Sequence, residues 1–593
     1  MTSRRSRAIC HTFAVTFLSS AAAACAPTLQ TNGAGLSASR ASADPTEPLK
    51  GVDRARQAVS RLTFGARPGE VDAVARMGVD RWIDRQLNPE SVPDAAADSL
   101  LDRLEITHKS PFELAADHPR ANEYHLSLGP QADSISMAAM TAAATKDTGS
   151  AMVQLANMRA RATEDDAKKD LAVRLTTQRG AVQRELVPSL LIRAEFSERQ
   201  LLEVMTVFWE NHFSIASANT GSPLSLVDYD HAIRAHALGK FRDLLGAVAK
   251  TPAMLVYLDN YQSVVDSLHP NLAEWQVEQR RAAHPPLGDT SLVHTVHRRR
   301  VGINENYARE LMELHTLGVD GGYTQRDVQE VARCLTGWGV DDFIDGGTFA
   351  FHSAQHDAGE KTVMGVHIPG GRGIEDGEQV LDMLARHPST AHFIARKLVI
   401  RFVSDSAPPA LVDRAAKTYL RTDGDIREVL RTIFTSPEFF SRGAYRAKVK
   451  TPYELVASVL RVMNAAPDTT LQLAQLVARL AQPIYGRATP DGWPDQAAAW
   501  MNGGALMDRV NLGVQIANNQ VRDINVSAWQ PAHALLALPA EQQIDGVIAA
   551  LLAGDASLET RQAMLAVQSP PNTPQHLGEL LAVALGSADF QRR

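Results

Sequence analysis

Acidic side chains that could serve as a general acid and a general base are concentrated in residues 303–339. Glu305, Arg309 and Glu313 are spaced four apart, which places them one turn apart on one side of a helix. Three more polar residues lie close to that face, and three hydrophobic residues occupy the opposite face: Asn306, Glu310 and Thr316, then Tyr307, Leu311 and Leu314. Hydrolysis of a glycosidic bond needs two carboxylates held at different pKa values. The pattern therefore indicates either acid–base chemistry or a ladder of ion pairs on a solvated helix.

A glycine turn and a second helix follow the acidic helix. Residues 318–322, GVDGG, supply the conformational freedom that ends a helix. Thr324 with Asp327 three positions later has the spacing of a capping box, which predicts a second helix that runs to Gly337. Cys334 lies among hydrophobic neighbours in that helix and is expected to be a buried, inert thiol.

Other segments contribute further candidate site residues. His212 falls on the hydrophobic stripe of a helix that begins near Ser197, so it is either a core histidine or a site residue. His315 projects away from the glutamates of its own helix, which therefore does not assemble a Glu/His cluster alone. Residues 483–495 contain three prolines and two glycines, and such loops often line sites. The candidates for substrate binding are Asn211, Asn304, Asn306, Trp338, Lys397, Asp491 and Trp493, and the tryptophans would stack on a sugar.

A metal site is a second possible chemistry. His356 and Asp357 follow His352 with the spacing of a weak metal pattern. Together with His212 and one of the glutamates, they would form a site of the kind that helical bundles build from inward Glu and His. The usual Glu-x-x-His spacing is absent from the acidic helix. The sequence requires no cofactor, and a divalent metal remains one option.

The string NENYARELMELHTLGVDGGYTQRDV at residues 304–328 resembles the signature of the DUF1800 family of bacterial proteins. Segments that are similar to the same family occur on both sides of it: 61–65, 208–213, 258–260 with Ser263, 356–357 with Lys361, 387–390, 396–398, 450–452 and 489–494. The resemblance implies a shared fold unit, a bacterial origin and often export. It implies no established substrate or reaction.

The amino terminus predicts an exported protein. Within residues 1–25, three arginines precede a hydrophobic run and then small residues, as in a signal peptide. Ala22–Cys25 resembles a lipobox, in which Cys25 would be lipidated, although Ala22 and Ala24 also satisfy an ordinary signal peptidase. Residues 26–50 have the composition of a flexible tether. The expected location is the periplasm, the outer membrane or the cell surface through a lipid anchor, or the medium after secretion.

Composition and hydrophobic period predict a helical globular protein. Removal of residues 1–24 takes the net charge from −7 to −10, which disfavours nucleic-acid binding. The helical period predicts an all-α fold, with a body at 51–515, long insertions at 108–150 and 264–300, and a helical extension at 516–593. Helices in the second half are expected at 376–386, 390–403, 410–420, 425–435, 452–464 and 470–481. Extended structure is expected only near 345–370, as a small hairpin that involves 348–351 and 361–367.

Three functions are consistent with these residues. The first is a carboxylate-dependent hydrolase that acts on extracytoplasmic glycan, in which Glu305, Glu310 and Glu313 act with Arg309, His212 and Asp491. The second is a metal-dependent enzyme with a His/Glu site. The third is a non-catalytic cell-envelope protein that binds a polymer or another exported protein. In that case Glu305–Arg309–Glu313 is only a ladder of exposed pairs, each worth about 0.3–0.5 kcal/mol.

Overall fold

The computed structural model describes residues 44–116, 169, 180, 182, 184–267, 269–283, 302–342, 346–465 and 471–593. Helices predominate in this part of the chain, and its strands form two small antiparallel pairs, so the prediction of a mainly α-helical fold is confirmed. No described helix has both the length and the hydropathy needed to cross a bilayer. The expected signal segment with Cys25, most of the tether and most of the 108–150 insertion lie outside the described residues.

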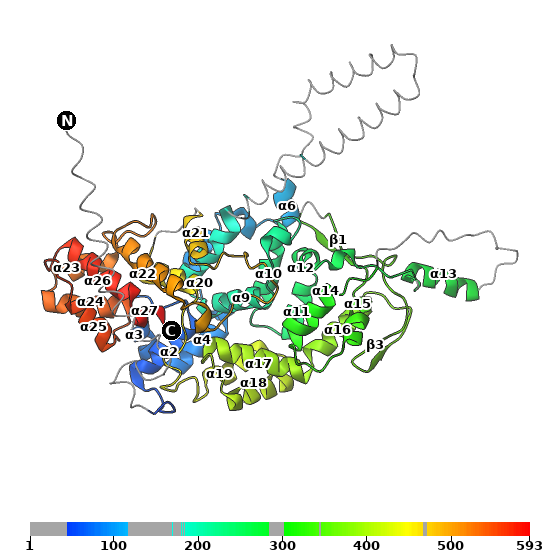
Figure 1. Cartoon of the computed structure of the whole chain (residues 1–593), viewed down its shortest axis with the longest axis horizontal. Coiled ribbons are helices and arrows are strands. Elements are labelled where there is room, and N and C mark those ends of the chain that lie inside the picture. Colours follow the sequence, from blue (N-terminus) through cyan, green and yellow to red (C-terminus); the bar gives the residue numbers. More distant parts are fainter. Residues whose placement is uncertain are drawn as a thin grey trace, which may run out of the picture.

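The described chain begins with helical segments of which the first two lie near the last helices of the chain (Figure 1). These first segments are α2 (Gly51–Leu62), α3 (Glu70–Met77), α4 (Val79–Leu87), η2 (Pro89–Ser91), α5 (Ala95–Leu101), η3 (Glu105–Thr107) and α6 (Pro111–Ala116). Residues 45–49, which the sequence assigns to the tether, are docked on residues 440–443 through backbone hydrogen bonds. Leu49 is buried there, so the packed part of the chain begins before residue 51.

The middle of the chain forms the body that carries the candidate site. Its helices are α9 (Gln200–His212), η6 (Ser217–Asn219), α10 (Ser225–His236), α11 (Phe241–Ala249), α12 (Pro252–Tyr257), η7 (Asn260–Gln262), α13 (Leu272–Ala283), α14 (Asn306–Glu310), η8 (Leu311–Thr316), α15 (Gln325–Cys334), α16 (Glu375–Ala385), α17 (Pro388–Phe402), α18 (Pro409–Arg421), α19 (Ile426–Phe434), α20 (Pro452–Met463) and α21 (Gln472–Arg479). The six helices expected from 376 to 481 are present within three residues of their predicted bounds. Helix α13 occupies part of the expected 264–300 insertion and projects from the end of the molecule opposite α23 (Figure 1).

Local signals explain why these segments are helical. In α19, Ile426, Val429, Leu430 and Ile433 follow the helical period and are at most 1% exposed. The Asp425 side chain accepts a hydrogen bond from the backbone N–H three residues on, which caps the helix. The capping box predicted between Thr324 and Asp327 is likewise formed at the start of α15. Cys334 is buried at the end of that helix, as expected.

Two small hairpins interrupt the helical body. Strands β3 (Lys361–Val363) and β4 (Val366–Ile368) pair across a tight turn, so the predicted extended run 361–367 forms a hairpin, but without 348–351. Strand β2 (Thr348–Phe351) pairs instead with β1 (Trp338–Asp341). The sequence did not identify β1, because its residues follow directly on a helix and show no clear alternation.

The last helices form a bundle that is joined to the body. They are α22 (Gly503–Ala517), α23 (Gln530–Ala537), α24 (Ala540–Leu551), α25 (Leu558–Leu565), α26 (Pro574–Gly586) and α27 (Ala588–Gln591), preceded by η10 (Ala497–Ala499). A division at residue 515 would cut α22, which packs along α26. Lys448 and Arg593 exchange backbone hydrogen bonds, and the Arg593 side chain lies 3.1 Å from Glu454. The end of the described chain is therefore anchored in the body.

Candidate functional site

The last three residues of helix α9, Glu210, Asn211 and His212, have side chains that contact three different parts of the protein. The helix forms because hydrophobic residues follow the 3.6-residue period, and Trp209 is completely buried. Glu210 points toward α10 and Tyr485, Asn211 contacts residues 483–495, and His212 enters the core. This helix end therefore joins the core to the loop that the sequence proposed as part of a site.

His212 is a satisfied core histidine that holds Lys397. Its Nε2 lies 3.0 Å from the backbone carbonyl of His315, which can only accept, so Nε2 carries the hydrogen. Its Nδ1 therefore accepts from the Lys397 ammonium at 2.8 Å. Burial, reinforced by the Lys397 charge, holds the pKa of His212 far below its usual value. The side chain is thus neutral, and it acts on any site only by positioning Lys397.

Lys397 is a partly buried amine with an unusual protonation equilibrium. Burial lowers the pKa of Lys397 to about 8, and the nearby charges of Asp495 and Asp491 oppose that shift. Its Nζ also lies 5.5 Å from the centre of the Phe393 ring. The structure thus brings Lys397, expected from the sequence as a binding residue, close to Asp491 and to the histidine that holds it.

Asn211 fixes the loop of residues 483–495 against α9. Its side-chain amide donates to the Trp493 carbonyl at 2.8 Å and accepts from the Trp493 N–H at 2.6 Å. Gly492 has φ +74°, and a Cβ at that position would collide with the Asn211 carbonyl, so only glycine fits. Tyr485 also has a positive φ, 51°, which is strained for a side chain of its size. The loop is therefore held in one conformation rather than left free.

Replacing Asn211 by alanine is expected to loosen this loop without unfolding the protein. Both backbone groups of Trp493 lose their partner, at a cost of about 1–3 kcal/mol. Hydrogen exchange should show faster exchange confined to residues 483–495. The variant Asn211→Asp retains the acceptor but not the donor and should show a smaller increase. Equal exchange in wild type and Asn211→Ala would show that other contacts hold the loop.

The acidic helix is α-helical only in its first half. After α14, residues 311–316 form the π-helix η8, in which the Leu317 N–H bonds to the Met312 carbonyl, five residues back. The wider turn rotates the later side chains away from their α-helical positions. Thr316, predicted on the polar face, is completely buried, and Leu314, predicted on the core face, is partly exposed. His315 is buried against Phe213, with ring centres 5.1 Å apart.

Glu310 lies within the electrostatic influence of Glu313 and of Asp491. Burial raises the pKa of Glu310, the charges of Glu313 and Asp491 raise it further, and the Arg309 charge opposes them. Asp491 accepts hydrogen bonds from Arg487, at 2.8 and 3.1 Å, and from Thr489 at 2.5 Å. The Arg487 hydrogen bonds, followed by those of Thr489, lower the pKa of Asp491. Two neighbouring carboxyl groups thus have their pKa values shifted in opposite directions.

The loop with Asp491 also contacts helix α12. The Tyr257 hydroxyl donates to the Ala488 carbonyl at 3.0 Å. Burial raises the pKa of Tyr257 to about 12, with contributions from Glu310 and Asp491. The tyrosine is therefore a neutral donor that lies between the acidic helix and the loop.

The remaining polar residues of the acidic helix serve local structure. Arg309 donates to Glu305 at 3.2 Å and to Gln325 at 3.0 Å, and Glu305 also accepts from Gln325. The expected ion-pair ladder therefore forms only its first step, because Glu313 accepts from the Tyr323 hydroxyl instead. Among the described residues, the side-chain contacts of Glu305 are confined to Arg309 and Gln325, while the Arg309 charge also acts on Glu310 and lowers its pKa.

Asn304 and Asn306 shape the start of the same helix. The Asn304 side chain accepts from the Asn306 N–H at 2.8 Å, and the Asn304 N–H donates to Ser263 at 3.2 Å. The Asn306 side chain donates to the Leu258 carbonyl at 3.4 Å. These contacts fix the entry of the helix, and the two residues are not placed among the carboxylates.

Trp338 is not available to stack on a sugar. It is completely buried in β1, where its ring packs edge-on against Phe349 at 5.4 Å. Trp493, by contrast, is partly exposed, and the Arg487 guanidinium lies 5.2 Å from its ring centre. Of the two tryptophans expected to bind a sugar, only Trp493 presents part of its ring outside the core.

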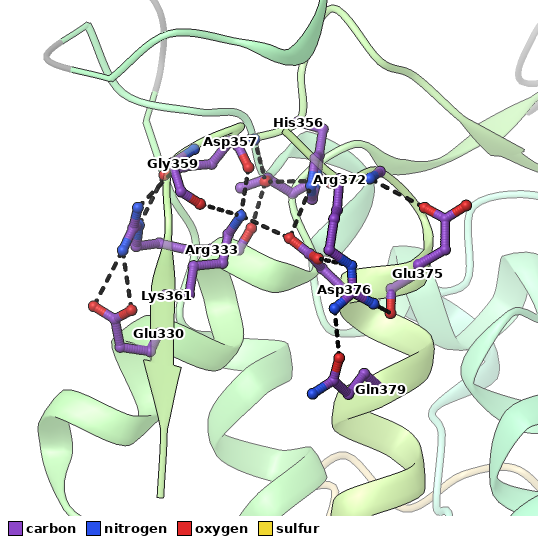
Figure 2. A network of polar contacts seen from close by, with 12 residues as sticks. Glu330, Arg333, His356, Asp357, Gly359, Lys361, Arg372, Glu375, Asp376 and Gln379 are labelled. Carbon is purple, nitrogen blue, oxygen red and sulfur yellow. Dashed lines mark hydrogen bonds and ion pairs between the residues drawn. The ribbon is translucent and has the colours of Figure 1, made fainter. Parts of the chain in front are cut away.

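His356 and Asp357 belong to a buried polar network that is separate from these carboxylates (Figure 2). Asp357 accepts from Arg333 at 2.8 and 3.2 Å, while Asp376 accepts from Lys361 at 2.8 Å. The Nε2 of His356 lies 3.4 Å from Asp376. His356, Asp357 and Asp376 are completely buried and Lys361 almost so, which favours a structural role that ties the β3–β4 hairpin to α15 and α16.

The expected metal ligands are not brought together. His356 binds the Thr336 carbonyl through Nδ1 at 2.7 Å, and the carboxylate of Asp357 is taken up by Arg333 and Gly359. Both ring nitrogens of His212 have protein partners elsewhere. Across the described residues, no three His, Cys, Asp or Glu side chains are grouped as a metal ion would require.

Glu210, which the sequence did not single out, lines a pocket of about 70 Å³ with Asn211, Tyr485, Arg487 and Trp493. Tyr485 donates to the Glu210 carboxyl at 2.8 Å. Burial, the Asp230 charge and a hydrogen bond to Asp230 hold the pKa of Glu210 well above its usual value. The only sequence signal was a glutamate in the last turn of the helix, next to Asn211 and His212, which the sequence did single out.

The protein is mainly helical, and Glu310 of its acidic helix lies within the electrostatic influence of Asp491 in the loop 483–495. Comparison with known proteins gives its family. The chain belongs to the family described as "Protein of unknown function (DUF1800)", whose model matches residues 57–592. The resemblance found at residues 304–328 is thereby confirmed, and the match also includes residues 516–592. No curated protein and no solved structure matches the chain.

Proposed function

We propose that the protein is an exported hydrolase that cleaves glycosidic bonds of an extracytoplasmic polysaccharide. Glu310 acts as the general acid and Asp491 as the general base. The observation that carries the proposal is the placement of these two carboxyl groups, from the acidic helix and from the loop, within electrostatic reach and with opposite pKa shifts. Glycosidases use such a pair, because one group must give a proton while the other takes one or attacks.

Neighbouring side chains support this division of roles. Arg487 and Thr489 stabilise the ionised form of Asp491, and Glu313 disfavours ionisation of Glu310. Trp493 lies two residues beyond Asp491 and presents a partly exposed ring on which a sugar face can pack. Asn211 holds that tryptophan in place through its backbone. A rigid loop of this kind suits a site that must keep its geometry.

The test is the release of reducing ends from a panel of bacterial and plant polysaccharides by residues 26–593 of the protein. Turnover of one polymer, with a melting temperature that rises in its presence, is the expected result. Binding without turnover would favour a non-catalytic envelope protein that uses Trp493 and Arg487 to hold a polymer or an exported partner. Turnover that depends on a stoichiometric metal, measured by elemental analysis, would favour the metal-dependent alternative.

We further propose that the protein is exported and anchored through a lipid on Cys25. Support comes from the signal-like residues 1–25, the lipobox-like Ala22–Cys25 and the acidic mature chain. One acyl chain binds membranes weakly, so stable anchoring needs the several chains of a processed lipoprotein. Replacement of Cys25 by serine should move the protein from the membrane fraction to the soluble fraction. Unchanged fractionation, with mass spectrometry showing cleavage after Ala24 and no lipid, would contradict the anchor but not export.

A further inference from the structure

A second pocket lies where the body meets the last helices of the chain. Its volume is about 70 Å³, and residues from four parts of the chain line it: α2, the segment 65–71, the segment 445–450 and the region 551–593. A buried water needs roughly 10–15 Å³ of such space, so the pocket has room for about five waters or one small ion. None of its lining residues lines the pocket beside Glu210.

The lining of this junction pocket is strongly basic. Arg56, Arg446, Lys450, Arg592 and Arg593 line it, against a single acidic residue, Asp589. The Asp589 carboxylate is already engaged, because it accepts from Arg446 at 2.7 Å and from Ser557 and Thr560 at 2.7 Å each. Its oxygens therefore already have donors from Arg446, Ser557 and Thr560.

Three of the five cations have counter-charges of their own. Arg56 pairs with Asp53 at 2.6 Å, Arg446 with Asp589 and Arg593 with Glu454. Among the described residues, Arg592 and Lys450 form no ion pair. The pocket thus carries positive charge that the described residues do not neutralise by direct contact.

Lys450 is the most informative of these residues because it is buried. It is 7% exposed, it lines the pocket, and its amine makes no hydrogen bond to any described residue. Its Nζ lies 4.1 Å from the centre of the Phe590 ring. The backbone around it is fixed, since its N–H donates to the Gln591 carbonyl and its carbonyl accepts from Arg509. The amine therefore reaches the pocket, where water or a bound anion must supply the acceptors that the described residues do not.

We propose that the junction pocket binds a small oxyanion, such as phosphate, sulfate or a short carboxylate, through Lys450 and Arg592. The anion would accept hydrogen bonds from both side chains and tie the segment 445–450 to the last residues of the described chain. Doubly charged tetrahedral anions fit better than a carboxylate, because several cations surround the pocket.

Binding should depend on pH through Lys450. Burial lowers the pKa of Lys450 to about 7, with further lowering by Arg446, Arg593 and Arg509 and an opposing effect of Glu454. Asp589 and Arg592 also face the pocket. An anion favours the charged amine, so binding takes up a proton. Affinity should therefore be highest below about pH 7 and fall by up to about tenfold per pH unit above it.

The experiment compares the melting temperature of the full chain in sodium sulfate, sodium phosphate and sodium acetate with that in sodium chloride of equal ionic strength. The melting temperature of wild type should rise with sulfate concentration until it saturates, and the rise should be larger at about pH 6 than at about pH 8. Because the charge of sulfate is the same at both pH values, that difference reports on the protein. Lys450→Met should lose that rise while it remains folded, because methionine suits the buried position. Arg81→Gln removes one exposed charge outside the pocket, and this control variant should retain the sulfate-dependent rise in melting temperature.

The arms of the experiment distinguish the ligand and can overturn the proposal. A saturable rise in sulfate and phosphate without one in acetate assigns a tetrahedral anion, and the reverse assigns a carboxylate. A rise that does not saturate and that Lys450→Met retains is the general effect of these salts on protein stability, and it overturns the proposal. If Lys450→Met does not fold, sulfate titration of Arg592→Gln by calorimetry decides the question. Unchanged affinity in that variant also overturns the proposal.

Discussion

Replacement of Glu310 by glutamine is expected to reduce polysaccharide hydrolysis by about 10²–10⁴-fold, the usual contribution of a general acid. Glutamine has nearly the same shape but cannot release a proton to the leaving group. Because the glutamate is only partly buried, the melting temperature should change by no more than about 2 °C. Asp491→Asn should have a similar effect on turnover, since the amide cannot accept the proton that the base must take.

Glu305→Gln is the matched control for these variants. Glu305 lies in the same segment, but it contacts Arg309 and Gln325 instead of the loop. Its replacement should leave turnover within about a factor of two and stability within about 0.5 kcal/mol. Loss of turnover in Glu305→Gln, together with retained turnover in Glu310→Gln, would show that the acid has been assigned to the wrong residue. Loss of stability in all three variants would favour a structural role for the acidic helix.

The pH profile provides an independent measure of the same assignment. A general acid must be protonated, so activity should fall as pH rises through the pKa of Glu310, which is raised above 4.5. A general base must be ionised, so activity should fall as pH drops through the pKa of Asp491, which is lowered below 3.8. The optimum is therefore acidic. Arg487→Met removes the hydrogen bonds that favour ionised Asp491, and it should shift the acid limb to higher pH.

The second large effect is expected in the buried network of Figure 2. Asp376→Asn leaves the almost completely buried Lys361 without its carboxylate partner at 2.8 Å. The removal of one member of a buried charge pair costs about 3–5 kcal/mol. Denaturant unfolding should show this loss for Asp376→Asn. Asp382→Asn, on the same helix but with a half-exposed side chain, should cost less than about 1 kcal/mol.

A double variant and the pH dependence of stability distinguish the loss of a charge pair from a change in packing in this network. The double variant Lys361→Met with Asp376→Asn should be less destabilised than Asp376→Asn alone, because no buried amine is left unpaired. The pKa values of Asp357 and Asp376 are both lowered, despite burial, by their hydrogen bonds and by neighbouring cations. Their contribution to stability is therefore complete above about pH 4 and is lost as pH falls below it. Equal losses in Asp376→Asn and Asp382→Asn would contradict the role of the pair.

The sequence predicted much of the secondary structure because the signals involved are local. The hydrophobic period and the caps of α15 and α19 lie within a few residues of the helices they define. The β3–β4 hairpin was predicted for the same reason, from a short extended run with a glycine turn. Strand β1 escaped prediction because its partner, β2, begins several residues later and imposes the extended conformation by pairing.

The candidate site was predicted only in part. Glu310, Asp491, Trp493, Asn211, His212 and Lys397 were all selected from their segments, and the structure relates each of them to the loop 483–495 or to α9. Glu305, Arg309, Trp338, His356 and Asp357 were selected by the same reasoning and have other roles. Glu210 was overlooked although it adjoins Asn211, since nothing in the residue string shows that Asp230 and Tyr485 face it.

The sequence by itself determined the fold class, the family, the approximate bounds of the helices from 376 to 481 and the polar residues available for chemistry, because periodicity, capping and motif strings are properties of neighbouring residues. Tertiary structure alone decided which carboxyl groups influence one another. Glu310 and Asp491 are far apart in the chain, and their pKa shifts arise from burial and from charges on other elements. It also decided the π-helical turn at residues 311–316, which the core accommodates by burying His315 and Thr316. An α-helical wheel cannot show that rotation, because it assumes 3.6 residues per turn throughout, whereas a π-helix has a wider turn.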